Sequence, residues 1–373
     1  MEKSKVYFTN MRVTANLNLL QKLERLIKKA GIAGIDFKSK YTAIKVHFGE
    51  PGNLAYLRPN YAKVVADVVK ELGGKVFLTD CNTLYVGRRK DALEHLEAAY
   101  ENGYNPFTTG CQIIIGDGLK GTDEAYVPIP GGECVKEAKI GRAVMDADIF
   151  VSLNHFKGHE LAGFGGALKN IGMGCGSRAG KMEMHSDGKP TVETEVCVGC
   201  GACVKICAHQ AIILTSKKAE IDHKRCVGCG RCIGTCHCDA IVAAWDEPSE
   251  MMNKKIAEYA LAVLNGRPHF HISLVIDVAP FCDCHAENDA PIIPDVGLFA
   301  SFDPVALDMA CADMANQAPA VANSYLGEQL QRRPRNDDHD HFNATHPETN
   351  WRVCVEHAEK LGIGTRSYEL IEI

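Results

Sequence analysis

The chain has 373 residues, of which 46% are hydrophobic and 24% charged, with a formal net charge of −6. This composition is typical of a globular protein with one large core or two domains, and the negative charge argues against a nucleic-acid partner. Because no apolar run is long enough to cross a bilayer and residues 1–13 lack the apolar core of a signal peptide, we expect a cytoplasmic protein without a membrane partner.

Short apolar runs alternate with helical patterns through the first half of the chain. The runs predict strands at residues 41–48, 76–79, 112–115 and 149–153, and the patterns between them predict helices at 59–72, 88–100 and near 135–145. Alternating strands and crossover helices indicate an α/β fold, with a mostly parallel sheet and helices on both faces.

A cysteine-rich segment, residues 192–244, interrupts this alternation. It contains two copies of the spacing C-x2-C-x2-C-x3-C, the bacterial ferredoxin pattern, in which three cysteines bind one [4Fe-4S] cluster and the fourth binds the other. We therefore predict two [4Fe-4S] clusters. The first is bound by Cys197, Cys200, Cys203 and Cys236, and the second by Cys226, Cys229, Cys232 and Cys207.

The α/β pattern resumes after this segment. It predicts helices at residues 253–264, 304–315 and 351–361, strands at 271–278, 297–300 and 368–373, and a polar surface loop at 331–350. Since similar alternation lies on both sides, we interpret residues 191–245 as an inserted α+β two-[4Fe-4S] ferredoxin-like domain. Residues 1–190 and 246–373 are then the two parts of one α/β domain.

Several polar residues follow the predicted strands, where ligands bind in an open parallel sheet. His47 follows the first strand, His155 and Lys157 follow the fourth, and Lys169 lies in a glycine-rich stretch, residues 163–180. Each of them taken alone is equally typical of ordinary loops. Together they predict a cleft in which His47, His155, Lys157 and Lys169 are catalytic, orienting and protonating a small anionic substrate.

The sequence Cys282-Asp283-Cys284-His285 follows another predicted strand. Two thiolates and an imidazole suit zinc or iron, so a third metal centre is one interpretation of this sequence. Free thiols beside a packed edge are the other interpretation. The candidate metal ligands are Cys282, Cys284, His285, Cys175 and His159.

The chain resembles domain-of-unknown-function family 362, in the subgroup that carries an inserted two-cluster ferredoxin. The resemblance rests on residues 45–59 (KVHFGEPGNLAYLRP), 77–87, 155–186, 282–285 (CDCH) and 301–308 (SFDPVALD). It implies iron–sulfur clusters and an α/β core, but no particular reaction. The chain departs from the ferredoxin pattern after each fourth cysteine, where Ala208 and His237 replace proline.

Three functions are compatible with these patterns. The first, which we predict, is an electron-transfer protein or subunit of anaerobic metabolism, which passes single electrons through two [4Fe-4S] clusters to a redox partner protein. The alternative is a self-contained iron–sulfur reductase acting on a small anionic substrate in the α/β cleft. The third is a docking scaffold in a larger redox complex, and a homo-oligomer is compatible with all three.

Overall fold

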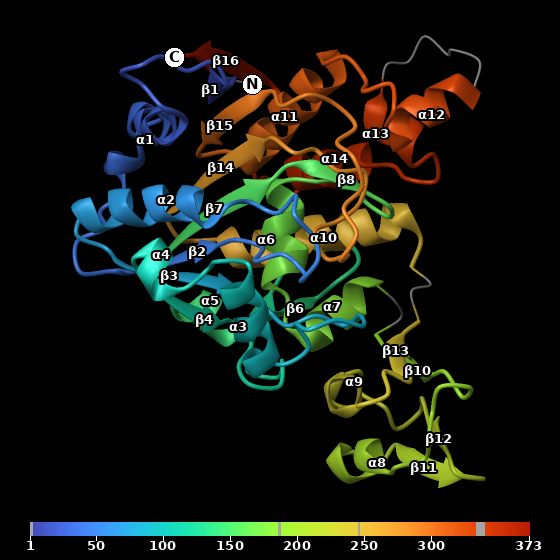
Figure 1. Ribbon diagram of the computed structural model, residues 1–373. Coiled ribbons are helices and arrows are strands. Elements are labelled where there is room, and N and C mark those ends of the chain that lie inside the picture. Colours follow the sequence, from blue (N-terminus) through green and yellow to red (C-terminus); the bar gives the residue numbers. More distant parts are fainter. Residues whose placement is uncertain (1–2, 186–187, 245–246, 333–339) are drawn as a thin grey trace.

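The structure is a computed structural model that describes residues 3–185, 188–244, 247–332 and 340–373 (Figure 1). Its described residues form an eight-stranded sheet in the order β16-β1-β15-β14-β7-β2-β3-β4. Among these strands β15 alone is antiparallel to its neighbours, so the predicted α/β class with a mostly parallel sheet is confirmed. The strands are β1 (Ser4–Asn10), β2 (Tyr41–Lys45), β3 (Lys75–Asp80), β4 (Gln112–Ile115), β7 (Ile149–His155), β14 (His269–Val275), β15 (Gly297–Ser301) and β16 (Tyr368–Glu372).

Helices cover both faces of the sheet (Figure 1). All seven residues of the central strand β7 are buried, as expected for a parallel strand between two helical layers. Its side chains alternate, because Phe150 packs into one core and Val151 into the other. The core that contains Val151 is covered by the helices α1 (Leu19–Lys29) and α2 (Pro59–Glu71). The core that contains Phe150 is covered by the helices α6 (Ala167–Cys175), α10 (Ser249–Leu264) and α11 (Pro304–Gln317).

The prediction of a helix near residues 135–145 was wrong. This stretch contains β6 (Glu137–Gly141), which pairs with β5 (Glu124–Pro128), and then the short helix α5 (Arg142–Asp146). In β6, Ala138 and Ile140 are buried, and they are two residues apart, which is the period of a strand.

Helix α3 (Ala92–Glu101) begins four residues later than predicted. The Asp91 carboxylate accepts the backbone N–H groups of Leu93 and Glu94 and so caps the helix. Arg88 and Arg89 therefore lie in the preceding loop, and the side chain of Arg89 is fully buried.

The predicted loop at residues 331–350 is only partly described, because residues 333–339 lie outside the described ranges. Helix α12 (Tyr325–Arg332) precedes these residues, and α13 (His341–Thr345) and α14 (Arg352–Lys360) follow them. No helix within the described ranges is both long and apolar enough to cross a membrane.

The cysteine-rich segment projects from the α/β body (Figure 1). At its base β10 (Pro190–Val192) pairs with β13 (Ile241–Ala243), so its two ends lie side by side. Between them are the hairpin β11 (Ile212–Thr215) and β12 (Lys218–Ile221), and the short helices α8 (Ala202–Ile206) and α9 (Arg231–Thr235). The division of the chain at residues 190 and 245 stays a prediction.

The close contact between α6 and α10 supplies a test of the packing. A Cβ atom at Gly172 in α6 would overlap the backbone carbonyl of Ile256 in α10. We expect Gly172→Ala to lower the free energy of unfolding by about 1–3 kcal/mol, because the two helices must move apart. Gly34→Ala is the control, since no described atom lies within 4 Å of the added Cβ. Equal urea-unfolding midpoints for the two variants would contradict the contact.

Candidate functional site

A cavity of about 750 Å³ opens at the carboxyl ends of the parallel strands. Lys45, Asp80 and His155, the last residues of β2, β3 and β7, all line it. Its volume lies within the usual range for small-molecule sites, and its position is the expected one for this kind of sheet. The loop after β14, the helix α6 and α7 (Arg178–His185) complete its wall.

Two buried ion pairs line one side of the cavity. Lys45 Nζ lies 3.0 Å from Asp80 Oδ1, and Arg89 Nε lies 2.8 Å from Glu50 Oε2. Burial alone would raise the pKa of Asp80, but the ammonium of Lys45 holds the pKa below its usual range. These four charges therefore compensate one another inside the protein.

Two further lysines line the cavity without a carboxylate partner among the described residues. The Lys181 ammonium, from α7, donates to the carbonyl of Gly176 at 2.6 Å. The Lys169 ammonium, from α6, lies 3.5 Å from Cys282 Sγ. Since no carboxylate compensates either charge, this side of the cavity is suited to an anionic ligand.

His47, a predicted catalytic residue, lines the cavity next to Arg89. Its Nε2 lies 3.0 Å from Arg89 NH1, and its Nδ1 accepts the Gly49 N–H at 3.0 Å. Burial, followed by the positive charge of Arg89, lowers the pKa of His47 well below its usual value. The ring is therefore neutral, and both of its nitrogens face N–H donors; its catalytic role stays a prediction.

His155, another predicted catalytic residue, is hydrogen-bonded at both ring nitrogens. Nδ1 lies 2.9 Å from Asp283 Oδ1, and Nε2 lies 2.8 Å from the carbonyl oxygen of Ile276. Both partners are hydrogen-bond acceptors, so each ring nitrogen can donate an N–H to one of them. Lys157 Nζ also contacts Asp283, at 3.3 Å. His155 and Lys157 thus fix the Cys282–His285 loop against β7, and their catalytic roles stay predictions.

The surroundings of Cys282 favour its thiolate form. A hydrogen bond from Cys284 lowers its pKa well below the usual value; burial opposes this shift, whereas Lys169 and Lys157 add to it. His159 also hydrogen-bonds Cys282. His159 belongs to the hairpin strand β8 (Lys157–His159), which pairs with β9 (Gly163–Gly165), so the histidines at 155 and 159 do not share a helical face.

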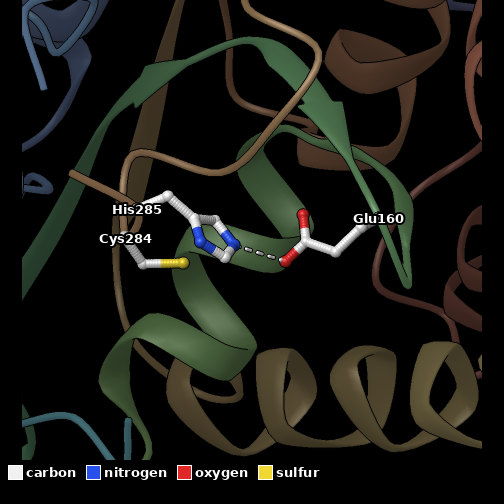
Figure 2. A group of neighbouring side chains, drawn as sticks. All are labelled: Glu160, Cys284 and His285. Atoms are coloured by element: carbon white, nitrogen blue, oxygen red, sulfur yellow. Dashed lines mark hydrogen bonds and ion pairs between the residues drawn. The ribbon is translucent and has the colours of Figure 1, made fainter. Parts of the chain in front are cut away.

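Three side chains at the cavity are close enough to hold one metal ion (Figure 2). Glu160, Cys284 and His285 each offer a ligand atom, and these atoms lie within 4.8 Å of one another. His285 Nε2 lies 3.0 Å from Glu160 Oε1, and this hydrogen bond raises the pKa of His285. Sequence reasoning identified Cys284 and His285 but not Glu160.

Cys175, proposed from the sequence as a ligand of the same centre, does not line the cavity. It is the last residue of α6, and its carbonyl oxygen lies 3.5 Å from Cys81 Sγ. Burial raises the pKa of its thiol to about 11. Cys175 therefore has the surroundings of a packed core cysteine, and its role as a ligand stays a prediction.

Eight of the nine cysteines of the projecting segment gather in two sets, each around its own hollow. Cys197, Cys200, Cys203 and Cys236, the first set, line one hollow, together with Cys238. Cys207, Cys226, Cys229 and Cys232, the second set, line the other. Each set combines three cysteines of one motif with the fourth cysteine of the other motif, which is the predicted grouping. Seventeen cysteines and this arrangement are compatible with metal or iron–sulfur binding.

Sequence reasoning missed several residues of the cavity: Lys45, Arg89, Lys181 and His185. A lysine at the end of an apolar strand was the available signal for Lys45. Arg89 was assigned to a helix, and Lys181 lies one residue beyond the glycine-rich stretch, so neither was among the predicted residues.

Comparison with known proteins matches residues 42–313, more than half of the chain, to the family described as "Domain of unknown function (DUF362)". No curated protein matches. The chain is 13% identical to a Thermotoga maritima protein solved by the Northeast Structural Genomics Consortium, with a TM-score of 0.41, covering 80% of this chain and 58% of that one.

A second solved structure, the lactate racemase apoprotein from Thermoanaerobacterium thermosaccharolyticum, is also 13% identical, with a TM-score of 0.35. The match covers 74% of this chain and 51% of that one. The chain thus spans between about half and three fifths of the length of these two proteins. At such TM-scores neither likeness carries information on function.

The surroundings of Cys282 predict its reactivity. Because the thiolate is the nucleophile, we expect iodoacetamide to alkylate Cys282 at a lower pH than an ordinary thiol. Lys169→Met removes the nearest ammonium and raises the pKa of Cys282, so the pH at which the alkylation rate is half-maximal rises by about one unit, equivalent to about 1.4 kcal/mol. Lys181→Met is the matched control. Mass spectrometry of the Cys282 peptide gives the rates, and equal rates in both variants would contradict the assignment.

Proposed function

The chain belongs to the DUF362 family, and we propose that it is an iron–sulfur oxidoreductase acting on a small anionic substrate. In this proposal single electrons from a redox partner protein pass through two [4Fe-4S] clusters to the cavity. The observation that carries the proposal is that the base of the cysteine-rich segment and the sheet share one cavity. At that base, Glu193 directly follows β10 and Val242 lies within β13. Both residues line the cavity together with Lys181.

The donor set of each hollow fits an iron–sulfur cluster. Burial, followed by the charges of Cys229 and Cys226, raises the pKa of Cys232 to about 12. Four crowded thiolates are unfavourable without a compensating cation, and iron supplies that positive charge. Backbone N–H groups also reach the sulfurs, as at Ala219–Cys197 (3.4 Å) and Ala240–Cys236 (3.3 Å). Such hydrogen bonds stabilise bound thiolates and adjust cluster potentials.

The two cysteine sets differ in their access to solvent. Cys200, in the first set, is exposed, whereas Cys232, in the second set, is buried. We assign the first set to docking of the partner protein and the second to delivery of electrons towards the cavity. When bound, the clusters supply one-electron transfer. A two-electron reduction of the substrate then consumes two electrons from the donor protein and two protons from solvent.

The residues of the cavity bind and orient the substrate in this proposal. Lys169 and Lys181 attract its negative charge, since neither has a carboxylate partner among the described residues. His47, held neutral beside Arg89, adds no positive charge to this wall and orients a polar group of the substrate. The buried pairs Lys45–Asp80 and Arg89–Glu50 hold this wall rigid and exclude water.

A metal centre at Glu160, Cys284 and His285 is a second candidate, favoured by their mutual proximity. Three ligands of mixed type leave a coordination position open, as in catalytic zinc sites. A zinc or iron ion bound there would polarise a substrate oxygen at the side of the cavity that also holds Cys282.

Iron and acid-labile sulfide counting tests the cluster assignment. We expect about eight irons in the anaerobically purified protein, and about four after either Cys203→Ser or Cys232→Ser, because each variant removes a ligand of one cluster. Cys238→Ser is the control, since Cys238 lies at the first hollow but belongs to neither set. A full iron count in the Cys203→Ser, Cys232→Ser double variant would overturn the proposal.

Anion binding tests the cavity. We expect succinate or inorganic phosphate to shift the EPR spectrum of the reduced protein, because the anion is bound close to the cysteine-rich segment. Lys181→Met weakens this binding about tenfold, equivalent to about 1.4 kcal/mol. Lys63→Met, on the exposed side of α2, is the control and leaves it unchanged. Unchanged anion affinity in a Lys169→Met, Lys181→Met double variant would contradict the assignment of the cavity.

A further inference from the structure

Arg178, the first residue of α7, is completely buried, and its guanidinium lacks a partner. None of its three nitrogens has a hydrogen-bond partner among the described residues. A buried cation without hydrogen bonds is strongly unfavourable. The position is therefore one at which a negatively charged group outside the polypeptide would be stabilised.

The side chain of Arg178 extends towards α9, which carries part of the second cysteine set. A Cβ atom at Gly230 or Gly234 would overlap the side chain of Arg178. Burial lowers the pKa of Arg178, while nearby negative charges raise it, first those of Asp117 and Asp91 and then those of Cys232 and Cys229. The guanidinium thus lies beside the second cysteine set.

The two cysteine motifs differ at the place where Arg178 packs. Gly234 lies two residues after the third cysteine of its motif, and the corresponding residue of the other motif is Lys205. Lys205 is exposed, and it lies on α8. The glycine makes room for a cation from the α/β body at the second motif, and the first motif has no such space.

Two carboxylates, those of Asp117 and Asp91, act on Arg178 through their charge, but neither accepts a hydrogen bond from it in the described part of the chain. Asp117 has no ion pair with Arg178, and its Oδ2 is itself without a hydrogen-bond partner among the described residues. Its other oxygen accepts the backbone N–H and the side-chain amide of Asn82, at 2.9 and 2.8 Å. Asp117 is therefore held by Asn82, and the guanidinium remains available.

We infer that Arg178 is a positioning residue for the second cluster, whose negative charge its guanidinium stabilises. The inference rests on the proposed function, because it requires a cluster at Cys207, Cys226, Cys229 and Cys232. A nearby cation favours the reduced, more negative state, so Arg178 raises the reduction potential of this cluster above that of the first. Electrons then move downhill from the exposed set to the set beside α7, the helix that also carries Lys181 and His185 into the cavity.

Potentiometric titration followed by EPR tests this inference. In Arg178→Gln we expect the reduction equilibrium constant of one cluster to fall at least tenfold, which is ~59 mV for a one-electron couple. The other cluster keeps its potential. Arg178→Lys retains a positive charge and most of the wild-type potential. Arg231→Gln is the matched control, since this arginine lies on α9 but is exposed, and water screens its charge.

Gly234→Ala supplies an independent measurement with Arg178 intact. The added methyl group displaces the guanidinium, so the same cluster loses potential, whereas Lys205→Ala at the corresponding place of the first motif changes neither cluster. Gly234→Ala and Lys205→Ala still test the role of Arg178 if the Arg178→Gln variant fails to fold. Two intact clusters with unchanged potentials in Arg178→Lys, Arg178→Gln and Gly234→Ala would overturn the inference and leave the proposed function standing. A wild-type protein without clusters would overturn the proposed function itself.

Discussion

The site depends on the buried ion pair between Lys45 and Asp80, which terminates two adjacent strands. Lys45 Nζ contacts both Asp80 and the side-chain oxygen of Asn170 in α6, at 3.0 and 2.7 Å. A Cβ atom at Gly174, one turn further along α6, would overlap the lysine. One ammonium thus joins β2, β3 and α6 at the sheet edge where the cavity opens. Removing Asp80 would leave the Lys45 ammonium buried and without a carboxylate partner among the described residues, which is far more costly than losing an exposed pair.

The regular part of the fold could be predicted because its signals are local. Helix α2 begins at Pro59 and buries valines spaced for a helix, and β4 coincides with the predicted strand at residues 112–115. The prediction failed at β6, where a few alternating residues are too short a signal to distinguish a strand from a helix. The antiparallel direction of β15 depends on how distant segments pair, which no local pattern contains.

The candidate site could be predicted only from motif spacing, or from the rule that ligands bind beyond the carboxyl ends of parallel strands. The grouping of cysteines follows from spacing, and His47, His155 and Lys157 follow from their places after strands. Glu160, Arg89, Lys181 and Arg178 could not be found in this way, because their importance arises from partners distant in sequence. Arg178 is the clearest case, since neither its burial nor the opposing Gly230 and Gly234 can be inferred from residues next to it.

The paired base of the cysteine-rich segment also bears on how the protein matures. The N–H of Glu247 donates to the carbonyl oxygen of His185 at 3.3 Å, so the body residues on either side of the segment are already adjacent. The main sheet contains no strand from the segment. The pairing of the main sheet consequently requires no part of the segment, so the α/β body can form its sheet whether or not the cysteines of the segment hold a ligand. Evolution could likewise exchange or delete the whole module with a short turn as its replacement.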